Sequence, residues 1–239
     1  MAVSTRIEVV VVCTDDEKPD LLLSSIPDNV LTNTTIVRGT RPCSTPRLVN
    51  DAMKRVVEDR GDPWLWLIVH PDIELAGDFF GNLTHWIYQL WKTDPMYGVV
   101  GAMGVRLDNG EKVHVGHLWD RSYEAGAPLQ GPCLVDTLDE LCVVLRGDRK
   151  WRLDNQLSTY HLWASELCLQ ERMCGRRSYV LPGMYLKHLS TSEEKSPDDP
   201  YFWFNLGVLS ERYRFDGQTM LTPSGCVYDN RDHSGVRLL

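Results

Sequence analysis

The sequence contains none of the short motifs that define the most common nucleotide-binding and hydrolase sites. No GxGxxG follows the first apolar run, no GxxxxGKS or GxxxxGKT is present, and no GxSxG occurs. The sequence therefore lacks the residues that define Rossmann dinucleotide sites, P-loops and the active sites of α/β-hydrolases. The chemistry of this chain must therefore rest on other side chains.

Paired cysteine motifs and long apolar segments are missing as well. The seven cysteines form no CxxC pair and no zinc-like spacing, and their odd number predicts reduced thiols in a reducing compartment. The first apolar run is the four valines of Val9–Val12, which is too short for a signal-peptide core or a membrane span. We therefore expect a cytoplasmic protein with no membrane span.

Positive charge is in deficit. The 239 residues include 25 Lys and Arg against 33 Asp and Glu, which gives a net charge of −8. Broad contact with phosphate backbones or anionic lipid needs an excess of basic side chains, so this balance disfavours a nucleic-acid partner. With 43% hydrophobic and 24% charged residues, the composition is that of a globular chain with one large core.

The sequence does contain a regular alternation of strand and helix patterns. We predict strands over 7–12, 34–37 and 64–69, and helices over 45–60 and 79–92. Because strands and helices alternate, the pattern predicts an α/β fold with parallel strands.

The second half of the chain is less regular. Residues 106–132 are polar and glycine-rich, which is typical of a loop region, and Asn109-Gly110 predicts a hairpin turn within it. Helices are predicted over 160–174 and 201–213. We expect one domain over 1–213 and a C-terminal tail of unknown role over 214–239.

One pair of polar residues stands at a position that favours chemistry. His70 and Asp72 directly follow the most apolar predicted strand. In open α/β sheets the ligand crevice lies beyond the carboxyl ends of the strands, so Asp72 is well placed to bind a metal ion. The alternative is structural, with Asp72 capping the next helix and His70 as a satisfied strand-end histidine.

Several segments carry a family resemblance when they are taken in order. They are Cys13-Thr14-Asp15, Asn50 in the following helix, WLWLIVHPDIEL, VVGAMGV, VDTLDELCVVLR, YHLWASELCLQERMCG and LKHLS. This series, over residues 7 to 213, resembles the GT-A-type glycosyltransferases. More narrowly, it is similar to the family-2-like group in which an HxD triplet replaces the usual DxD.

The resemblance implies a fold and an activity. It implies a single GT-A-like α/β domain with a mostly parallel central sheet and helices on both faces. The implied reaction moves a sugar from a nucleoside-diphosphate sugar to an acceptor hydroxyl with inversion. The implied cofactor is a divalent metal, Mn²⁺ or Mg²⁺, because a hard cation neutralises the charge of the departing diphosphate.

The same resemblance implies a metal site. Asp72 matches the metal ligand of the triplet, and His188 matches a histidine near the end of the family core that approaches the same metal. His70 takes the first position of the triplet, where it either ligates the metal or donates a hydrogen bond to phosphate or ribose. For His188, a buried strand-end histidine remains the alternative.

Donor-binding residues follow from the resemblance too. The loop after the first strand cradles base and ribose in this family, which here means Thr14 and Asp15, with Glu17 as a further candidate. Arg41 and Asn50 face the same crevice. A solvated turn remains the alternative for Asp15.

The catalytic base is where the chain departs from the family. Relatives supply an acid at the start of the helix that here reads ASELCLQERMCG, but Ala164 occupies that position and Glu166 lies two residues on. The other candidates are Asp136, Asp139 and Glu140 in VDTLDEL. We favour Glu166 as the base that accepts the acceptor's proton, narrowly over Asp139. The structural alternative is that Glu166 pairs with Arg172 or Arg176.

The acceptor remains open. A glycan or another hydroxyl-bearing acceptor fits, and a modified nucleic-acid base of the viral or phage type is disfavoured by the net charge. The rival hypothesis is a non-catalytic nucleotide-sugar-binding or scaffold module with a degenerate active site, which Ala164 permits.

Overall fold

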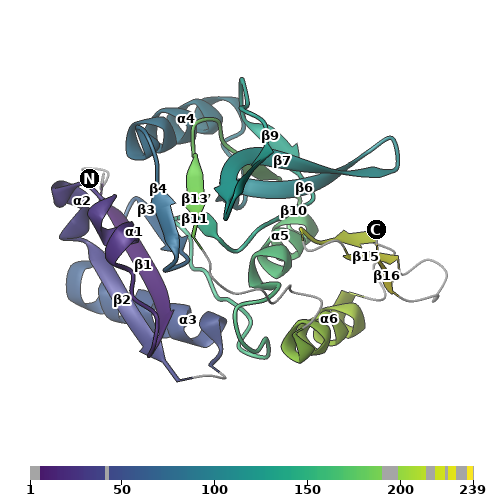
Figure 1. Cartoon of the computed structure of the whole chain (residues 1–239), viewed down its shortest axis with the longest axis horizontal. Coiled ribbons are helices and arrows are strands. Elements are labelled where there is room, and N and C mark those ends of the chain that lie inside the picture. Colours follow the sequence, from purple (N-terminus) through teal and green to yellow (C-terminus); the bar gives the residue numbers. More distant parts are fainter. Residues whose placement is uncertain are drawn as a thin grey trace.

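A seven-stranded sheet forms the centre of the computed structural model, which describes residues 6–40, 43–189, 199–213, 219–223, 226–229 and 236–238 (Figure 1). In spatial order its strands are β2 (Thr34–Gly39), β1 (Ile7–Thr14), β3 (Leu65–Val69), β11 (Cys142–Arg146), β5 (Val100–Gly101), β12 (Ser178–Val180) and β9 (Cys133–Val135). β1 is parallel to both its neighbours and β12 is parallel to β5. β11 is antiparallel to β3 and β5, and β9 is antiparallel to β12, so the sheet is mixed.

Helices cover both faces of this sheet, as predicted. The helices are α1 (Asp20–Ser24), α2 (Asp28–Leu31), α3 (Thr45–Arg60), α4 (Phe79–Thr93), α5 (Trp163–Met173) and α6 (Pro200–Tyr213). Alternate strand residues point to opposite faces, so Val10 packs in the cluster with α3, α5 and α6, whereas Val9 and Val11 pack with α1 and α4. Two separate apolar clusters therefore hold the sheet between the helices.

A second sheet crosses the region that the sequence assigned to a loop. Its order is β10 (Thr137–Leu138), β6 (Met103–Asp108), β7 (Glu111–Asp120), β13 (Leu186–His188) and β4 (Ile73–Leu75), with β8 (Tyr123–Gly126) paired to β7. Asp108 pairs with Glu111, so Asn109 and Gly110 form the predicted two-residue turn. The loop prediction is wrong over 106–126, where these strands form, because it rested on the polar and glycine-rich composition of the segment. Residues 127–132 lie outside the strands, as predicted.

The C-terminal segment adds a small third sheet. Strands β14 (Thr219–Leu221), β15 (Cys226–Asp229) and β16 (Val236–Leu238) pair in that order. The Thr137 hydroxyl donates to the carbonyl oxygen of Leu221 over 2.5 Å, so this segment contacts β10 of the second sheet. The division of the chain at residue 213 stays a prediction.

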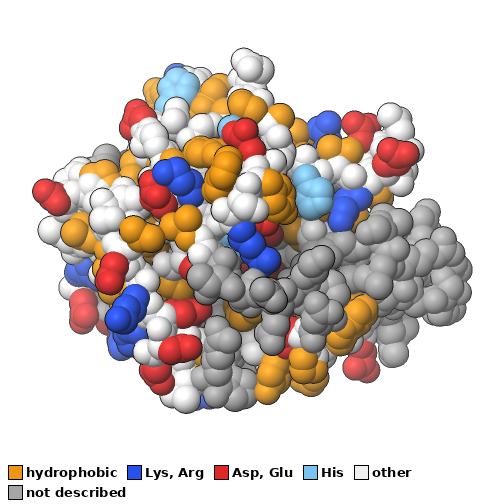
Figure 2. All heavy atoms as spheres, in the orientation of Figure 1, with side chains coloured by type: hydrophobic (Ala, Val, Ile, Leu, Met, Phe, Trp, Pro, Cys, Tyr) orange, Lys and Arg blue, Asp and Glu red, His pale blue; other side chains and the backbone are white. Residues whose placement is uncertain are grey.

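The surface shows a group of apolar side chains along the lower right edge in Figure 2, where Figure 1 places α6. Trp203 and Phe204 on this helix are 40% and 55% exposed, while Phe202 and Leu206 face the core.

In the described part of the chain, no helix combines the length and the apolar character needed to cross a bilayer.

Candidate metal and donor site

The backbone brings three predicted residues together at the end of β3. His70 follows that strand, and the chain then turns through Asp72 into β4. β13 pairs antiparallel with β4 so that His188 lies opposite Ile73, and the amide of Leu189 donates to the carbonyl oxygen of Asp72 over 2.8 Å. This register places His188 beside Asp72, although 116 residues separate them in the sequence.

The three side chains converge on one point. Asp72 Oδ1 contacts His70 Nδ1 directly, and Asp72 Oδ2 lies 3.4 Å from His188 Nε2. One ligand atom from each of His70, Asp72 and His188 lies within 4.8 Å of the others, which makes them a candidate metal-binding group among the described residues. Two imidazoles and a carboxylate suit a borderline divalent cation.

A carboxylate outside this group orients one of its histidines. Asp120 is the last residue of β7, and its Oδ1 accepts a hydrogen bond from His188 Nδ1 over 2.8 Å. Such a contact to the distal nitrogen turns Nε2 toward the metal position, which is the usual support of a metal-bound histidine. The donor set and its support therefore fit a divalent ion.

The electrostatics of the group favour an ionised carboxylate. Burial acts to raise the pKa of Asp72, but hydrogen bonds from His188 and His70 outweigh it and hold that pKa well below its usual range. Burial acts to lower the pKa of His188, but the contacts with Asp72 and Asp120 outweigh it and raise that pKa. Asp72 is thus charged and ready to bind a cation at neutral pH.

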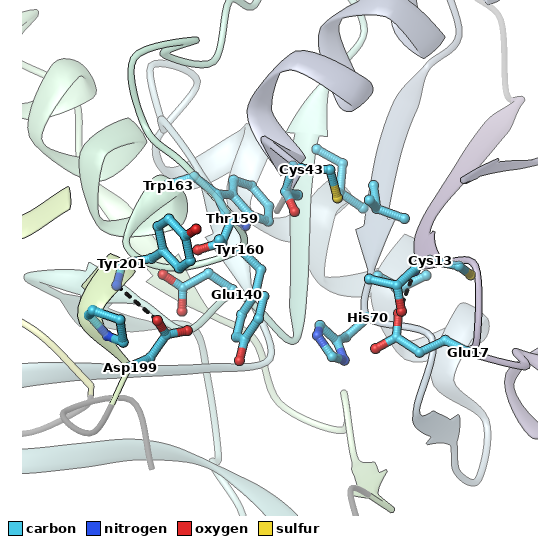
Figure 3. A pocket seen from close by; sticks show the side chains of 16 residues that line it. Cys13, Glu17, Cys43, His70, Glu140, Thr159, Tyr160, Trp163, Asp199 and Tyr201 are labelled. Atoms are coloured by element: carbon cyan, nitrogen blue, oxygen red, sulfur yellow. Dashed lines mark hydrogen bonds between the residues drawn. The ribbon is translucent and has the colours of Figure 1, made fainter. Parts of the chain in front are cut away.

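A cavity of about 330 Å³ opens beside this group (Figure 3). In the figure, His70 lies between Glu17 on one side and Tyr160 and Glu140 on the other. The wall comes from the ends of β1 and β3 and from the loops before α5 and α6; it includes Cys13, Thr14, Glu17, Cys43, Thr45, His70, Glu140, Thr159, Tyr160, Trp163, Asp199 and Tyr201. Its size is in the range of small-molecule sites.

The four residues expected to bind the donor are placed differently from one another. Thr14 lines the cavity, and its amide donates to Glu17 Oε2 over 2.6 Å. Asp15 is exposed and accepts a hydrogen bond from the Thr40 hydroxyl over 2.8 Å. Arg41 lies outside the described residues.

Asn50 has a structural environment. Its amide nitrogen donates to the carbonyl oxygen of Leu153 over 2.8 Å and to Asn155 Oδ1 over 2.7 Å, and its oxygen accepts from the amide of Leu153 over 2.9 Å. Asn50 is not among the residues that line the cavity. The structure therefore places Asn50 as a clamp between α3 and the 153–155 segment.

Glu166 is enclosed between α5 and α6. Its side chain is 1% exposed, accepts from the Tyr213 hydroxyl over 3.0 Å, and pairs with Arg212 at 3.2 Å. Gln170 donates to both carboxylate oxygens over 2.6 Å. Burial raises the pKa of Glu166, while the bonds from Gln170 and Tyr213 oppose that rise. The structure does not bring Glu166 to the cavity, and Arg212 takes the place of the arginine partners considered from the sequence.

Of the acids of VDTLDEL, Glu140 is the one that lines this cavity. Glu140 accepts from the amide of Leu162 over 2.5 Å, at the start of α5. Asp139 Oδ1 accepts from the amide of Leu141 over 2.9 Å. Burial raises the pKa of both carboxyl groups, and the neighbouring Asp139 raises that of Glu140 further.

The loop before α5 has a constrained backbone. Thr159 and Leu162 have φ values of 56° and 67°, a region that non-glycine residues seldom adopt. Between them, Tyr160 packs edge-on at 5.7 Å from the His70 ring, and His161 pairs with Asp199 over 3.0 Å. Because Leu162 leaves helical geometry, α5 starts at Trp163 rather than at the predicted residue 160.

Sequence reasoning missed two acids of this region. Asp120 belongs to the hairpin region predicted as a loop, and only the pairing of β7 with β13 brings it to His188. Asp199 lies in a turn before α6 and enters the cavity wall through the fold of that segment. Neither residue stands in a motif that could have identified it.

No protein-family model matches the chain. A protein of Fuscovulum blasticum, described as ATP synthase subunits region ORF 6, is 24% identical over 169 residues, which span 67% of this chain and 65% of that relative, just under two thirds of its length. The crystal structure of GalNAc-T7 with UDP, GalNAc and Mn²⁺ aligns with 10% identity and a TM-score of 0.54, over 80% of this chain and 45% of that chain. The crystal structure of A197 from STIV aligns over 98% of this chain and 93% of that chain, with 8% identity and a TM-score of 0.46.

The likeness to GalNAc-T7 concerns the fold. At 10% identity it shows a shared arrangement of strands and helices, which confirms the predicted single α/β domain with a GT-A-like fold. This chain covers less than half of that protein, so the likeness leaves the activity of the chain to be argued from its own site.

Proposed function

We propose that the protein is a divalent-metal-dependent glycosyltransferase that uses a nucleoside-diphosphate sugar. The observation that carries the proposal is the convergence of His70, Asp72 and His188 within 4.8 Å at the edge of a 330 Å³ cavity. The fold shared with GalNAc-T7, whose crystal structure holds UDP and Mn²⁺, supports it.

The residues of the chain divide into those that hold the metal and those that hold the nucleoside. His70, Asp72 and His188 would hold a Mn²⁺ or Mg²⁺ ion, which supplies positive charge to the diphosphate when bound. Thr14 and Glu17 would receive the nucleoside at the end of β1, because both line the adjoining wall of the cavity. The exposed ring of Tyr160 offers a stacking surface beside His70.

We assign the proton-accepting carboxylate to the Asp139–Glu140 pair instead of Glu166. As the acceptor oxygen bonds to the anomeric carbon, the bond from that carbon to the diphosphate breaks, and the hydroxyl proton passes to a carboxylate. Glu140 lines the cavity, whereas Glu166 is enclosed by Gln170, Arg212 and Tyr213. A carboxyl group with a raised pKa is a stronger base than a free one, which suits this role.

The test is donor turnover with a panel of uridine, guanosine and thymidine diphosphate sugars in the presence of Mn²⁺. We expect release of nucleoside diphosphate for at least one donor, loss of that release in EDTA, and loss in Asp72→Asn. Asp62→Asn is the matched control, since Asp62 is exposed and lies outside the cavity wall. Full turnover in EDTA would contradict the metal role.

The alternative function is a nucleotide-sugar-binding module without turnover. The specific observation in its favour is that Ala164, where relatives carry an acid, is fully buried and offers no proton acceptor. Calorimetry together with the turnover assay separates the two functions. A binding module binds a donor with Mn²⁺ in the calorimeter but releases no nucleoside diphosphate with any acceptor. Absence of binding by every donor would remove both.

A further inference from the structure

A second cavity of about 330 Å³ gathers four arginines at the edge of the central sheet. It lies between β6, β9, β12 and the end of α5, and none of its lining residues belongs to the wall of the first cavity. The lining consists of Arg106, Leu107, Leu134, Val135, Asp136, Cys168, Arg172, Arg176, Arg177 and Ser178. In a chain of net charge −8, four arginines and one aspartate thus line a single cavity.

Arg106 is poorly satisfied by its protein partners. Its Nη1 faces the weak acceptor Cys133 Sγ at 3.2 Å, and its Nη2 reaches Asp108 Oδ2 only at 3.4 Å. Its Nε is buried and has no hydrogen-bond acceptor among the residues that the structure describes. The two terminal nitrogens of Arg106 thus meet one weak and one distant acceptor, so a stronger acceptor from a ligand at these nitrogens would be favourable.

The other arginines keep donors available while their positions are fixed. Arg172 uses Nη2 to contact the carbonyl oxygen and Oδ1 of Asp136, at 2.8 and 3.0 Å. Arg176 is held by both oxygens of Glu171, and Arg177 contacts Asp94 Oδ2 at 3.1 Å. The pair with Asp136 fixes Arg172 at the cavity and leaves it further donors, whereas Arg176 and Arg177 are held by acids that do not line the cavity and contribute positive charge beside it.

The charge and shape of the cavity indicate the class of ligand. A tetrahedral phosphate presents oxygens in several directions and carries up to two charges, so it suits a cavity lined by several arginines better than a planar carboxylate does. Leu107 and Leu134, at 40% and 45% exposure, add apolar surface at the same cavity. We propose that this cavity binds the phosphate group of an organic phosphate whose apolar part lies on these leucines.

The experiment is a calorimetric titration of the full chain with inorganic phosphate and with octyl phosphate, in EDTA so that the metal site does not contribute. We expect saturable binding of both, with octyl phosphate tighter. Arg106→Gln should weaken binding at least about tenfold, the loss of roughly one charged hydrogen bond. Leu134→Ser should reduce the difference in affinity between octyl phosphate and inorganic phosphate, because it removes apolar contact surface.

Two controls distinguish the cavity from other sites. Arg152→Gln removes an exposed arginine outside the cavity and should leave both affinities unchanged. Asp72→Asn should also leave them unchanged, which separates this proposal from the proposed function. Unfolding curves identify any variant that has lost its fold, and Arg106→Lys then replaces Arg106→Gln because it keeps the charge but loses the fork of donors.

The source of the phosphate is decided by a third probe, vesicles of phosphatidylcholine with phosphatidic acid. If the wild-type protein sediments with these vesicles and the Arg106→Gln protein does not, the ligand is a lipid headgroup. Binding of octyl phosphate without vesicle sedimentation assigns it to a soluble phosphate. If no probe binds, or if Arg106→Gln binds all of them as the wild type does, the proposal is wrong.

Discussion

Replacement of Glu166 by leucine tests whether this acid supports the fold or the reaction. Leucine has a similar volume but accepts no hydrogen bond, so the Tyr213 hydroxyl and the Gln170 amide lose their acceptor. Arg212 is affected less, because it keeps Asp154 at 2.5 Å and Gln156 at 2.8 Å.

The expected magnitude follows from these contacts. A hydrogen bond to a charged group contributes about 1.5 to 3 kcal/mol, and two such bonds are lost. Relief of the buried carboxylate offsets part of this loss, as the raised pKa of Glu166 indicates. We expect a net loss of about 2 to 3 kcal/mol in the free energy of unfolding, which lowers Tm by roughly 4 to 12 °C in a chain of this size.

The assay combines thermal unfolding by circular dichroism with donor turnover per folded molecule. If Glu166 is structural, kcat changes by less than about tenfold below the unfolding transition, whereas removal of a general base costs a factor of about 10² to 10⁴. Asp139→Asn is the control with the opposite expectation, a loss of turnover with little change in Tm. Asparagine keeps the oxygen that accepts from the amide of Leu141 but cannot take up the proton. A Glu166→Leu protein with unchanged Tm and turnover reduced a hundredfold would refute this reasoning.

Three further predictions concern the metal, a clamp and pH. Asp72→Asn should weaken Mn²⁺ binding at least about tenfold in calorimetry, because a charged ligand becomes neutral; unchanged affinity would remove Asp72 from the site. Asn50→Ala should lower the free energy of unfolding by about 2 kcal/mol in urea titrations, since two bonds to the Leu153 backbone are lost; a change below about 0.5 kcal/mol would contradict the clamp. Burial raises the pKa of Glu166 above its ordinary value of 4.5, so the folded state holds this proton more tightly than the unfolded state. The stability of the wild type relative to Glu166→Gln should therefore be greatest below about pH 4.5 and decline as the pH rises; a flat difference would contradict it.

The sequence by itself determined the α/β class and the first half of the fold. Apolar runs such as Ile7–Val12 and the helical spacing over 45–60 are local patterns, so they identify β1 and α3 without knowledge of their partners. The position of Asp72 after a buried strand is equally local, and it directed attention to the end of β3 where His70 and Asp72 lie together.

Only the tertiary structure decided which distant residues complete the site. The pairing of β13 with β4 and β7 brings His188 to Asp72 and Asp120, and no spacing in the sequence encodes that register. The packing of α6 against α5 buries Glu166 beside Tyr213. The sequence of α5 alone does not show whether this acid faces solvent or the core. The gathering of four arginines at one sheet edge has the same origin: long-range strand pairing and helix packing set these contacts, and both depend on surfaces far apart in the chain.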